Sequence, residues 1–270
     1  MQKYWHVVKI GFSNTLVYRI NFFFRAAFGL IPLLATIYLW RTVYAGKTDH
    51  GGGSVAGYSL AGMISYYLLV TIVDTLTAVN EDDWQIAADI KDGNISQFLL
   101  KPIDYLSYRL CLFFSGRIIF TAVSVIPVGI FILCWRRYFV GPVDATAFAF
   151  FLLSTVLTGF LQFFMSYTMA LLSFWLLEVS TVIFMLFAFE YIAGGHLFPL
   201  NILPPVLASA LNATPFPYLL YFPVGIYLGQ ITGPALGRGL AIQAGWTLFF
   251  YFLARFVWKR GISKYSAVGG

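Results

Sequence analysis

The chain has 270 residues, of which 60% are hydrophobic and 10% are charged, and its formal net charge is +6. Soluble domains carry about a quarter charged residues, so this chain has too few charges to cover a soluble surface. An aromatic content of 19% also excludes a disordered chain. The composition therefore indicates an all-α integral membrane protein with several spans of about 20 residues.

The positive net charge does not indicate binding to nucleic acid. Adjacent cations occur only at Arg136–Arg137 and Lys259–Arg260, so the chain lacks the basic stripe that binds a phosphate backbone. The three histidines are scattered, and neither His-Glu-x-x-His nor Cys-x-x-Cys occurs. The sequence thus predicts no metal site and no catalytic nucleophile.

The N-terminal segment, residues 1–21, combines cations with apolar residues at helical spacing. Trp5, Val8, Phe12 and Leu16 fall on one face, and the lysines fall away from it. This pattern predicts an amphipathic helix in the membrane interface. It lacks the small-residue cleavage site that follows the core of a signal peptide.

Six apolar segments follow, each long enough to be predicted as a membrane span. They cover approximately residues 22–44, 55–79, 110–135, 145–172, 179–196 and 240–258. The positive-inside rule places both termini in the cytoplasm, because more cations then lie on the cytoplasmic side. That side holds Lys3, Lys9, Arg19, Arg25, Lys91, Lys101, Arg109, Lys259, Arg260 and Lys264, against Arg41, Lys47, Arg136, Arg137 and Arg238 on the other.

The longest polar stretch, residues 80–109, is predicted to be cytoplasmic. Residues 81–93 form an amphipathic pattern that Gly93 would end. A second short helix is expected to begin at Asn94 or Ser96 and to end at Lys101–Pro102. Exposed Ile, Phe and Leu on such a helical unit favour docking into a groove of a partner. A plain solvated loop is the alternative.

Residues 198–236 are apolar, carry no charge and contain seven prolines counted from Pro199 to Pro234. The prolines exclude one long helix. Broken backbone at membrane depth must be buried in protein or line a cavity. Short re-entrant helices before the last span are therefore expected.

This order of features resembles the permeases of ABC type-2 exporters, of the subgroup usually encoded as a pair beside one ATPase. The resemblance covers essentially the whole chain, residues 1–270, as a single transmembrane domain. It rests on Asp89-Ile90-Lys91-Asp92-Gly93-Asn94-Ile95-Ser96-Gln97-Phe98-Leu99-Leu100-Lys101-Pro102-Ile103, on Phe198-Pro199-Leu200 with Leu203-Pro204, on Thr214-Pro215-Phe216, and on the ending Lys264-Tyr265-Ser266-Ala267-Val268-Gly269-Gly270.

The resemblance implies a mechanical role for two of these segments. Residues 80–109 would contain the coupling helix that docks on an ABC ATPase dimer, with residues 89–102 carrying the contacts. Residues 198–236 would form extracellular re-entrant helices that gate the exit, with Phe198, Pro199, Pro204 and Pro215 in that gate. The chain would pair with a second permease, identical or a sister, in the cytoplasmic membrane. Family cargoes include drugs, lipids, polysaccharides and peptides, so the fold does not name the cargo.

The chain is predicted to lack an ATPase site of its own. Gly46-Lys47-Thr48 matches only the end of a phosphate-binding loop, and position 41, where its first glycine belongs, is Arg41. No cofactor is therefore expected on this chain, and ATP with Mg²⁺ would bind the partner ATPase.

Glu190 is the ionisable residue expected deepest in the membrane. It lies 12 residues after Glu178, or about 18 Å along a helix. An ionisable group at that depth is a candidate functional residue, and a structural pair with Arg117 or with an arginine of the sister subunit is the alternative. His196 is expected on another face of the same helix. A membrane-embedded, lipid-modifying enzyme with Glu190 and His196 as acid and base is the rival function.

Overall fold

The computed structural model describes residues 2–48, 54–79, 82–176 and 178–265, and in these ranges the chain is helical without strands. The α-helices are α1 (Gln2–Val17), α2 (Arg19–Thr48), α3 (Leu60–Thr77), α4 (Asp82–Lys91), α5 (Ile95–Leu99), α6 (Tyr105–Cys134), α7 (Ala145–Ala170), α8 (Ser180–Ala193), α9 (Pro205–Asn212), α10 (Tyr221–Tyr227) and α11 (Gly233–Ile262). Short 3₁₀ helices are η1 (Arg136–Tyr138), η2 (Leu171–Phe174), η3 (Leu200–Ile202) and η4 (Phe216–Tyr218). The all-α class is confirmed.

Within the described residues, five helices are long and apolar enough to cross a membrane. They are Arg19–Gly46, Leu60–Thr77, Tyr105–Cys134, Ala145–Phe174 and Gly233–Ile262. The predicted span at residues 179–196 contains instead the 14-residue helix α8. At 1.5 Å per residue α8 is about 21 Å long, less than the roughly 30 Å of hydrocarbon it would have to cross alone.

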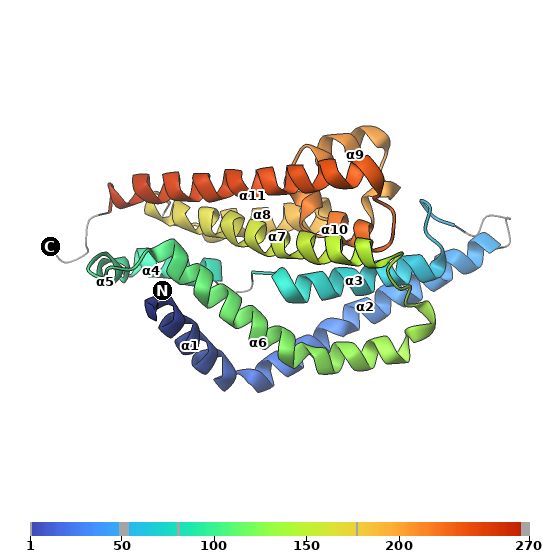
Figure 1. The fold of residues 1–270 in the computed structure, drawn as a ribbon, viewed down its shortest axis with the longest axis horizontal. Coiled ribbons are helices and arrows are strands. Elements are labelled where there is room, and N and C mark those ends of the chain that lie inside the picture. Colours follow the sequence, from blue (N-terminus) through green and yellow to red (C-terminus); the bar gives the residue numbers. More distant parts are fainter. Residues whose placement is uncertain (1, 49–53, 80–81, 177, 266–270) are drawn as a thin grey trace.

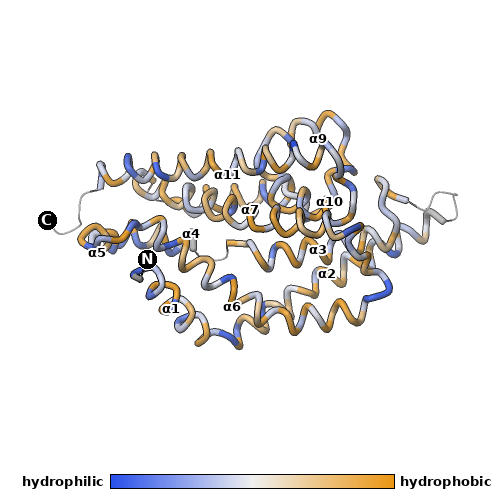
Figure 2. The backbone as a smooth tube through the Cα atoms, viewed as in Figure 1, coloured by the Kyte–Doolittle hydropathy of each residue, from blue (hydrophilic) through white to orange (hydrophobic). Residues whose placement is uncertain are grey.

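The long helices run along the longest axis of the molecule (Figure 1). Both ends of the described chain lie at the same end as α4 and α5, whereas α9 and α10 lie toward the opposite end. Hydrophobic residues dominate the middle of the bundle, and hydrophilic residues gather toward its two ends (Figure 2). This distribution is the one expected of a bundle that spans a bilayer.

The N-terminal helix α1 meets α2 at a sharp elbow around Tyr18 and packs along α6 (Figure 1). The helices approach closely at Gly11, where a Cβ atom would lie 3.0 Å from the Cβ of Ser115. The Lys3 ammonium donates a hydrogen bond to the carbonyl oxygen of Pro102. The predicted N-terminal helix is thus present, and it braces the turn between α5 and α6.

Helix α6 begins at Tyr105, earlier than the predicted start of the third span near residue 110. Asp104 explains the early start, because its carboxylate accepts hydrogen bonds from the Ser107 backbone N–H at 3.0 Å and the Ser107 hydroxyl at 2.6 Å. Such an N-cap satisfies backbone donors that the first helical turn leaves free.

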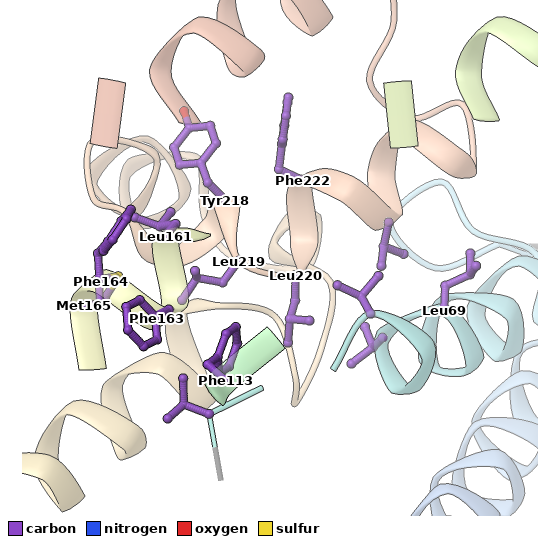
Figure 3. Packing of buried hydrophobic residues seen from close by; sticks show 14 of the residues in the cluster. Leu69, Phe113, Leu161, Phe163, Phe164, Met165, Tyr218, Leu219, Leu220 and Phe222 are labelled. Atoms are coloured by element: carbon purple, nitrogen blue, oxygen red, sulfur yellow. The ribbon is translucent and has the colours of Figure 1, made fainter. Parts of the chain in front are cut away.

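Residues 198–236, which we call the proline-rich segment, contain the short helices η3, α9, η4 and α10, as their composition suggests. Leu219 and Leu220 are almost fully buried and point into one cluster with Phe163 of α7 and Phe113 of α6 (Figure 3). Pro215 and Pro217 are buried as well. Helices η4 and α10 are therefore part of the hydrophobic core, whereas α9 has no buried residue.

Candidate functional site

Two features of the described chain combine polar groups with an arrangement that could serve transport. One is the α4–α5 unit, defined here as residues 82–104, at the end of the bundle where both ends of the described chain lie. The other is a polar cavity inside the bundle. Each contains residues that the sequence singles out.

The α4–α5 unit is fixed to α6 by a nearly buried ion pair. The Arg109 guanidinium contacts the Asp89 carboxylate, and the two side chains are 5% and 19% exposed. The Tyr105 hydroxyl donates to Asp89 Oδ2 at 2.7 Å and accepts from Arg109 Nε at 2.9 Å. Arg109 also donates to the side-chain oxygen of Gln85 at 3.3 Å. The hydrogen bonds compensate the burial of both charges.

The turn between α4 and α5 has the backbone that its sequence predicts. Gly93 follows the end of α4 with a φ of 79°, a left-handed conformation that a glycine adopts without strain. Asn94 occupies the position before α5, but its side chain makes no capping hydrogen bond. Ile90 and Ile95 are buried on either side of the turn and anchor it to the core. The predicted helical unit is present, and the loop alternative is wrong for residues 82–91 and 95–99.

The unit presents a hydrophobic outer surface. Leu100 is 88% exposed, Leu99 50% and Trp84 45%. Phe98 instead turns inward, with its ring 5.1 Å from that of Tyr105 and 4.9 Å from that of Tyr108. The remaining residues expected to mediate coupling are exposed, namely Asp92, Asn94, Lys101 and Pro102.

Trp84 was not among the predicted contact residues, although the sequence carries a signal for it. The buried positions of α4 are Asp83, Ile86, Ala87 and Ile90, which recur at the i, i+3, i+4, i+7 spacing of one helix face. Trp84 lies off that stripe. A large aromatic residue outside the buried face of a short helix is a candidate for contact with a partner.

The second feature is a cavity of about 430 Å³ among α2, α3, α6, α7 and α8. Its polar lining residues come from all five helices and from the chain just after α8. They are Arg25, Thr36, Thr71, Asp74, Thr75, Arg117, Gln162, Glu190 and His196. Polar side chains gathered inside a membrane bundle face the bundle interior because lipid cannot solvate them.

Glu190 is 8% exposed and accepts a hydrogen bond from Gln162 Nε2 at 2.6 Å. Arg117, the partner considered from the sequence, lines the same cavity. The structure thus places Glu190 inside the bundle, as expected, and adds the amide of Gln162 on α7 as its neighbour.

His196 lines the same cavity as Glu190, although helical periodicity places the two on different faces. Helix α8 ends at Ala193, so a helical face no longer describes position 196. Gly195 has a φ of 97°, and the chain turns back at this residue. His196 Nε2 then lies 3.4 Å from Asp74 Oδ1, and its ring stacks on that of Tyr191 with centroids 4.9 Å apart.

The contact with Asp74 also locates the turn. Asp74 belongs to the last turn of α3, whose side chains Tyr66 and Val73 are fully buried inside the bundle. A histidine at the far surface of the bundle could not reach it. Tyr66 and Tyr67 of α3 hold the same turn by donating to the carbonyl oxygens of Gly195 and Leu197 at 2.7 and 2.6 Å. The chain after α8 therefore turns within the bundle.

The residues predicted to form the gate lie away from that cavity. Phe198 is half-buried, Pro199 and Pro215 are buried, and Pro204 is exposed at the start of α9. Among the described residues, the cavity lining includes Glu190 and His196 and none of these four.

A metal centre finds no support in the part of the chain that the structure describes, where no three His, Cys, Asp or Glu side chains form a suitable group. The cavity instead offers hydrogen-bonding and charged groups of both signs. Such a lining can accommodate polar parts of a molecule inside an otherwise apolar bundle.

Comparison with known proteins agrees with this architecture. The family described as ABC-2 family transporter protein matches residues 30–269. No curated protein matches the chain. The matched region includes the α4–α5 unit, all residues of the α8–α11 segment and four of the five long apolar helices in full. The chain belongs to the ABC-2 family of transporter proteins.

Proposed function

We propose that the chain, a membrane-embedded permease component of an ABC transporter, exports its cargo with energy supplied by a separate ATPase subunit. The α4–α5 unit would receive the motion of the ATPase, and the bundle would move the cargo. The exposed surface of Trp84, Leu99 and Leu100 carries this proposal. In this family, ATP and Mg²⁺ would bind the partner ATPase, and ATP would be hydrolysed there.

The exposed leucines are suited to docking because their base is rigid. Ile95 is fully buried beneath them, and the Arg109–Asp89 ion pair joins α4 to α6. Truncating an apolar residue in a desolvated groove typically removes 1 kcal/mol or more of binding energy. A rigid apolar knob would also transmit displacement without first deforming.

The topology that fits this role places both termini and the α4–α5 unit in the cytoplasm. Helix α8 and the buried turn after it would provide the sixth crossing, and η3 to α10 would form the re-entrant segment on the other side. The Asp74–His196 contact supports a turn within the bundle. Phe198, Pro199, Pro204 and Pro215 would then control the exit rather than contact the inner cavity.

The polar cavity would form one wall of the cargo pathway, and a second permease would supply the opposite wall. Large apolar side chains remain exposed along α2, α6 and α8, including Phe28, Ile130 and Phe184. Lipid or a second permease would cover them. An identical or sister subunit fits the family expectation for this pairing.

The proposal is tested with the complex that forms when the chain is co-expressed with its ATPase subunit. Replacing Leu99 with Glu should abolish stimulation of ATP turnover by the permease, and a bulky residue at Gly93 should have the same effect. Normal assembly and turnover in both variants would contradict the role of the α4–α5 unit. Activity on lipids by the isolated chain in liposomes would instead support the enzyme hypothesis.

A further inference from the structure

The end of α11 grips the α4–α5 unit directly. The Tyr265 hydroxyl donates to the carbonyl oxygen of Gly93 at 2.9 Å and lies 3.0 Å from the hydroxyl of Ser96. Both partners belong to the turn between α4 and α5. The hydroxyl therefore joins the last helix to the turn that presents Leu99 and Leu100.

Two further contacts join α11 to the start of α6. The Arg255 guanidinium pairs with the Asp104 carboxylate. The Trp258 ring stacks on the Tyr105 ring, with centroids 4.9 Å apart and an interplanar angle of 11°. Arg255 and Tyr265 thus hold the unit, and Trp258 holds the first residue of α6; we call these three residues the α11 clasp.

The clasp is supported by close packing. Phe174 of η2 places its ring 5.9 Å from that of Trp258 and 6.1 Å from that of Tyr265. Gly261 makes room for Phe174, because a Cβ atom at this glycine would lie 2.2 Å from the ring. Tyr265, three residues after the end of α11, is consequently held against η2.

The same helix is tied to the proline-rich segment at its other half. Gln243 is fully buried, and its Nε2 donates to the carbonyl oxygen of Tyr218 at 2.9 Å. The Tyr218 hydroxyl in turn donates to the carbonyl oxygen of Asn212 at the end of α9, at 3.3 Å. Gln243 and Trp258 are 15 residues apart, which corresponds to about 22 Å of helix.

We propose that α11 is a rigid connection through which displacement of the α4–α5 unit reaches the proline-rich segment, with Tyr265 and Gln243 as the positioning residues at its two ends. This inference rests on the proposed function. Coupling between distant sites requires packed elements and hydrogen-bond networks of this kind.

The test measures movement of α9 in the complex with its ATPase, reconstituted in lipid nanodiscs. Val206 on α9 is 78% exposed and is replaced by Cys in a background that carries Cys111→Ser and Cys134→Ser. The rate of labelling with a maleimide is compared between nucleotide-free and ATP–vanadate-trapped complexes. The reference complex should show at least a threefold difference in rate.

Tyr265→Phe should retain less than half of that difference while the complex still assembles, because only the hydroxyl is lost and the ring stays against Phe174. Ser96→Ala should have a similar effect, and the double variant should be no worse than the single variants, since one hydrogen-bond network is broken in each. Tyr38→Phe is the matched control on α2, where an exposed tyrosine loses the same atom, and it should behave as the reference.

If Tyr265→Phe and Ser96→Ala leave the labelling difference unchanged, the proposed role of α11 is contradicted, but the proposed function is not. Failure of the chain to assemble with the ATPase, or no nucleotide-dependent difference in the reference complex, would contradict the proposed function as well. Gln243→Asn, which shortens the amide by one methylene, should reduce the difference as Tyr265→Phe does. A labelling difference that Gln243→Asn leaves unchanged would show that Gln243 does not connect α11 to the proline-rich segment.

Discussion

The Arg109 guanidinium on α6 and the Asp89 carboxylate on α4 form an ion pair in which the arginine is nearly inaccessible to solvent. The pair joins α4 to α6, so it fixes the α4–α5 unit, which exposes Leu99 and Leu100, relative to a long apolar helix. A mechanical role for the α4–α5 unit depends on this attachment.

Replacing Asp89 with Ala should strongly destabilise the protein, because it leaves the buried Arg109 charge without its carboxylate. Breaking a buried pair in this way costs about 3–5 kcal/mol. Asp92→Ala removes an exposed carboxylate from the same unit and should change stability little. Thermal unfolding of the detergent-solubilised chain, followed by tryptophan fluorescence, compares the two. Equal unfolding temperatures would show that the ion pair does not hold the unit.

Leu100→Asp should leave folding intact and weaken assembly with the ATPase at least tenfold. The side chain is 88% exposed, so its loss removes little from the core, whereas a charge in an apolar groove is costly. Leu207→Asp, on exposed α9, is the matched control and should assemble normally. The amount of ATPase that co-purifies with each variant is compared. Equal recovery of the ATPase with both variants would rule out docking through Leu100.

Gly239→Ala should destabilise the bundle by about 1–3 kcal/mol, the usual cost of overpacking. The added Cβ would lie 2.1 Å from the Phe222 ring, which is packed in α10. Gly237→Ala on the same helix meets no atom within 4 Å and should be neutral or slightly stabilising, because Ala favours helix. The unfolding temperatures of the two variants are compared. Equal unfolding temperatures would contradict a tight contact between α10 and α11 at Gly239.

Glu190→Leu should cost about 1–3 kcal/mol, because the Gln162 amide loses its buried acceptor. Glu190→Gln keeps an acceptor oxygen and should unfold within a few degrees of the unsubstituted protein. Thermal unfolding in detergent again provides the comparison. A Leu variant as stable as the Gln variant would mean that this hydrogen bond contributes nothing to the bundle.

The link between Asp104 and Arg255 should make stability depend on pH in the acidic range. Burial alone would raise the pKa of Asp104, but hydrogen bonds from Ser107 and Arg255 and the arginine charge outweigh it and lower the pKa below 3.8. A lowered folded-state pKa stabilises the protein above the unfolded-state pKa, and this contribution is lost as the pH falls through the folded-state pKa.

Asp104→Asn should therefore unfold at a lower temperature than the unsubstituted protein at pH 7, and the gap should narrow below about pH 4. Unfolding temperatures measured from pH 7 to pH 3 give this gap directly. A gap that stays constant over the whole range would show that ionised Asp104 contributes nothing through Arg255.

Local signals made much of this fold predictable. Alternating apolar runs and breakers located the five long helices, and Gly93 correctly marked the end of α4. Prolines between positions 199 and 234 predicted short helices in place of a long one. Each of these features depends on residues close together in the sequence.

Tertiary contacts were beyond such signals. The turn at Gly195 is fixed by Tyr66 and Tyr67, 129 and 130 residues away from their carbonyl partners. His196 consequently meets Asp74 instead of following α8 as helical spacing suggests. The grip of Tyr265 on Gly93 likewise joins segments 172 residues apart. No periodic pattern reports a contact at that separation.

Photo-crosslinking of the chain to its ATPase subunit in native membranes shows directly whether the α4–α5 unit docks on the ATPase. A benzophenone amino acid is placed at Leu100, which is 88% exposed, and at Leu207 on α9 as the control. A crosslink to the ATPase is expected from position 100 and none from position 207. Crosslinking from position 207 without any from position 100 would contradict docking through the α4–α5 unit.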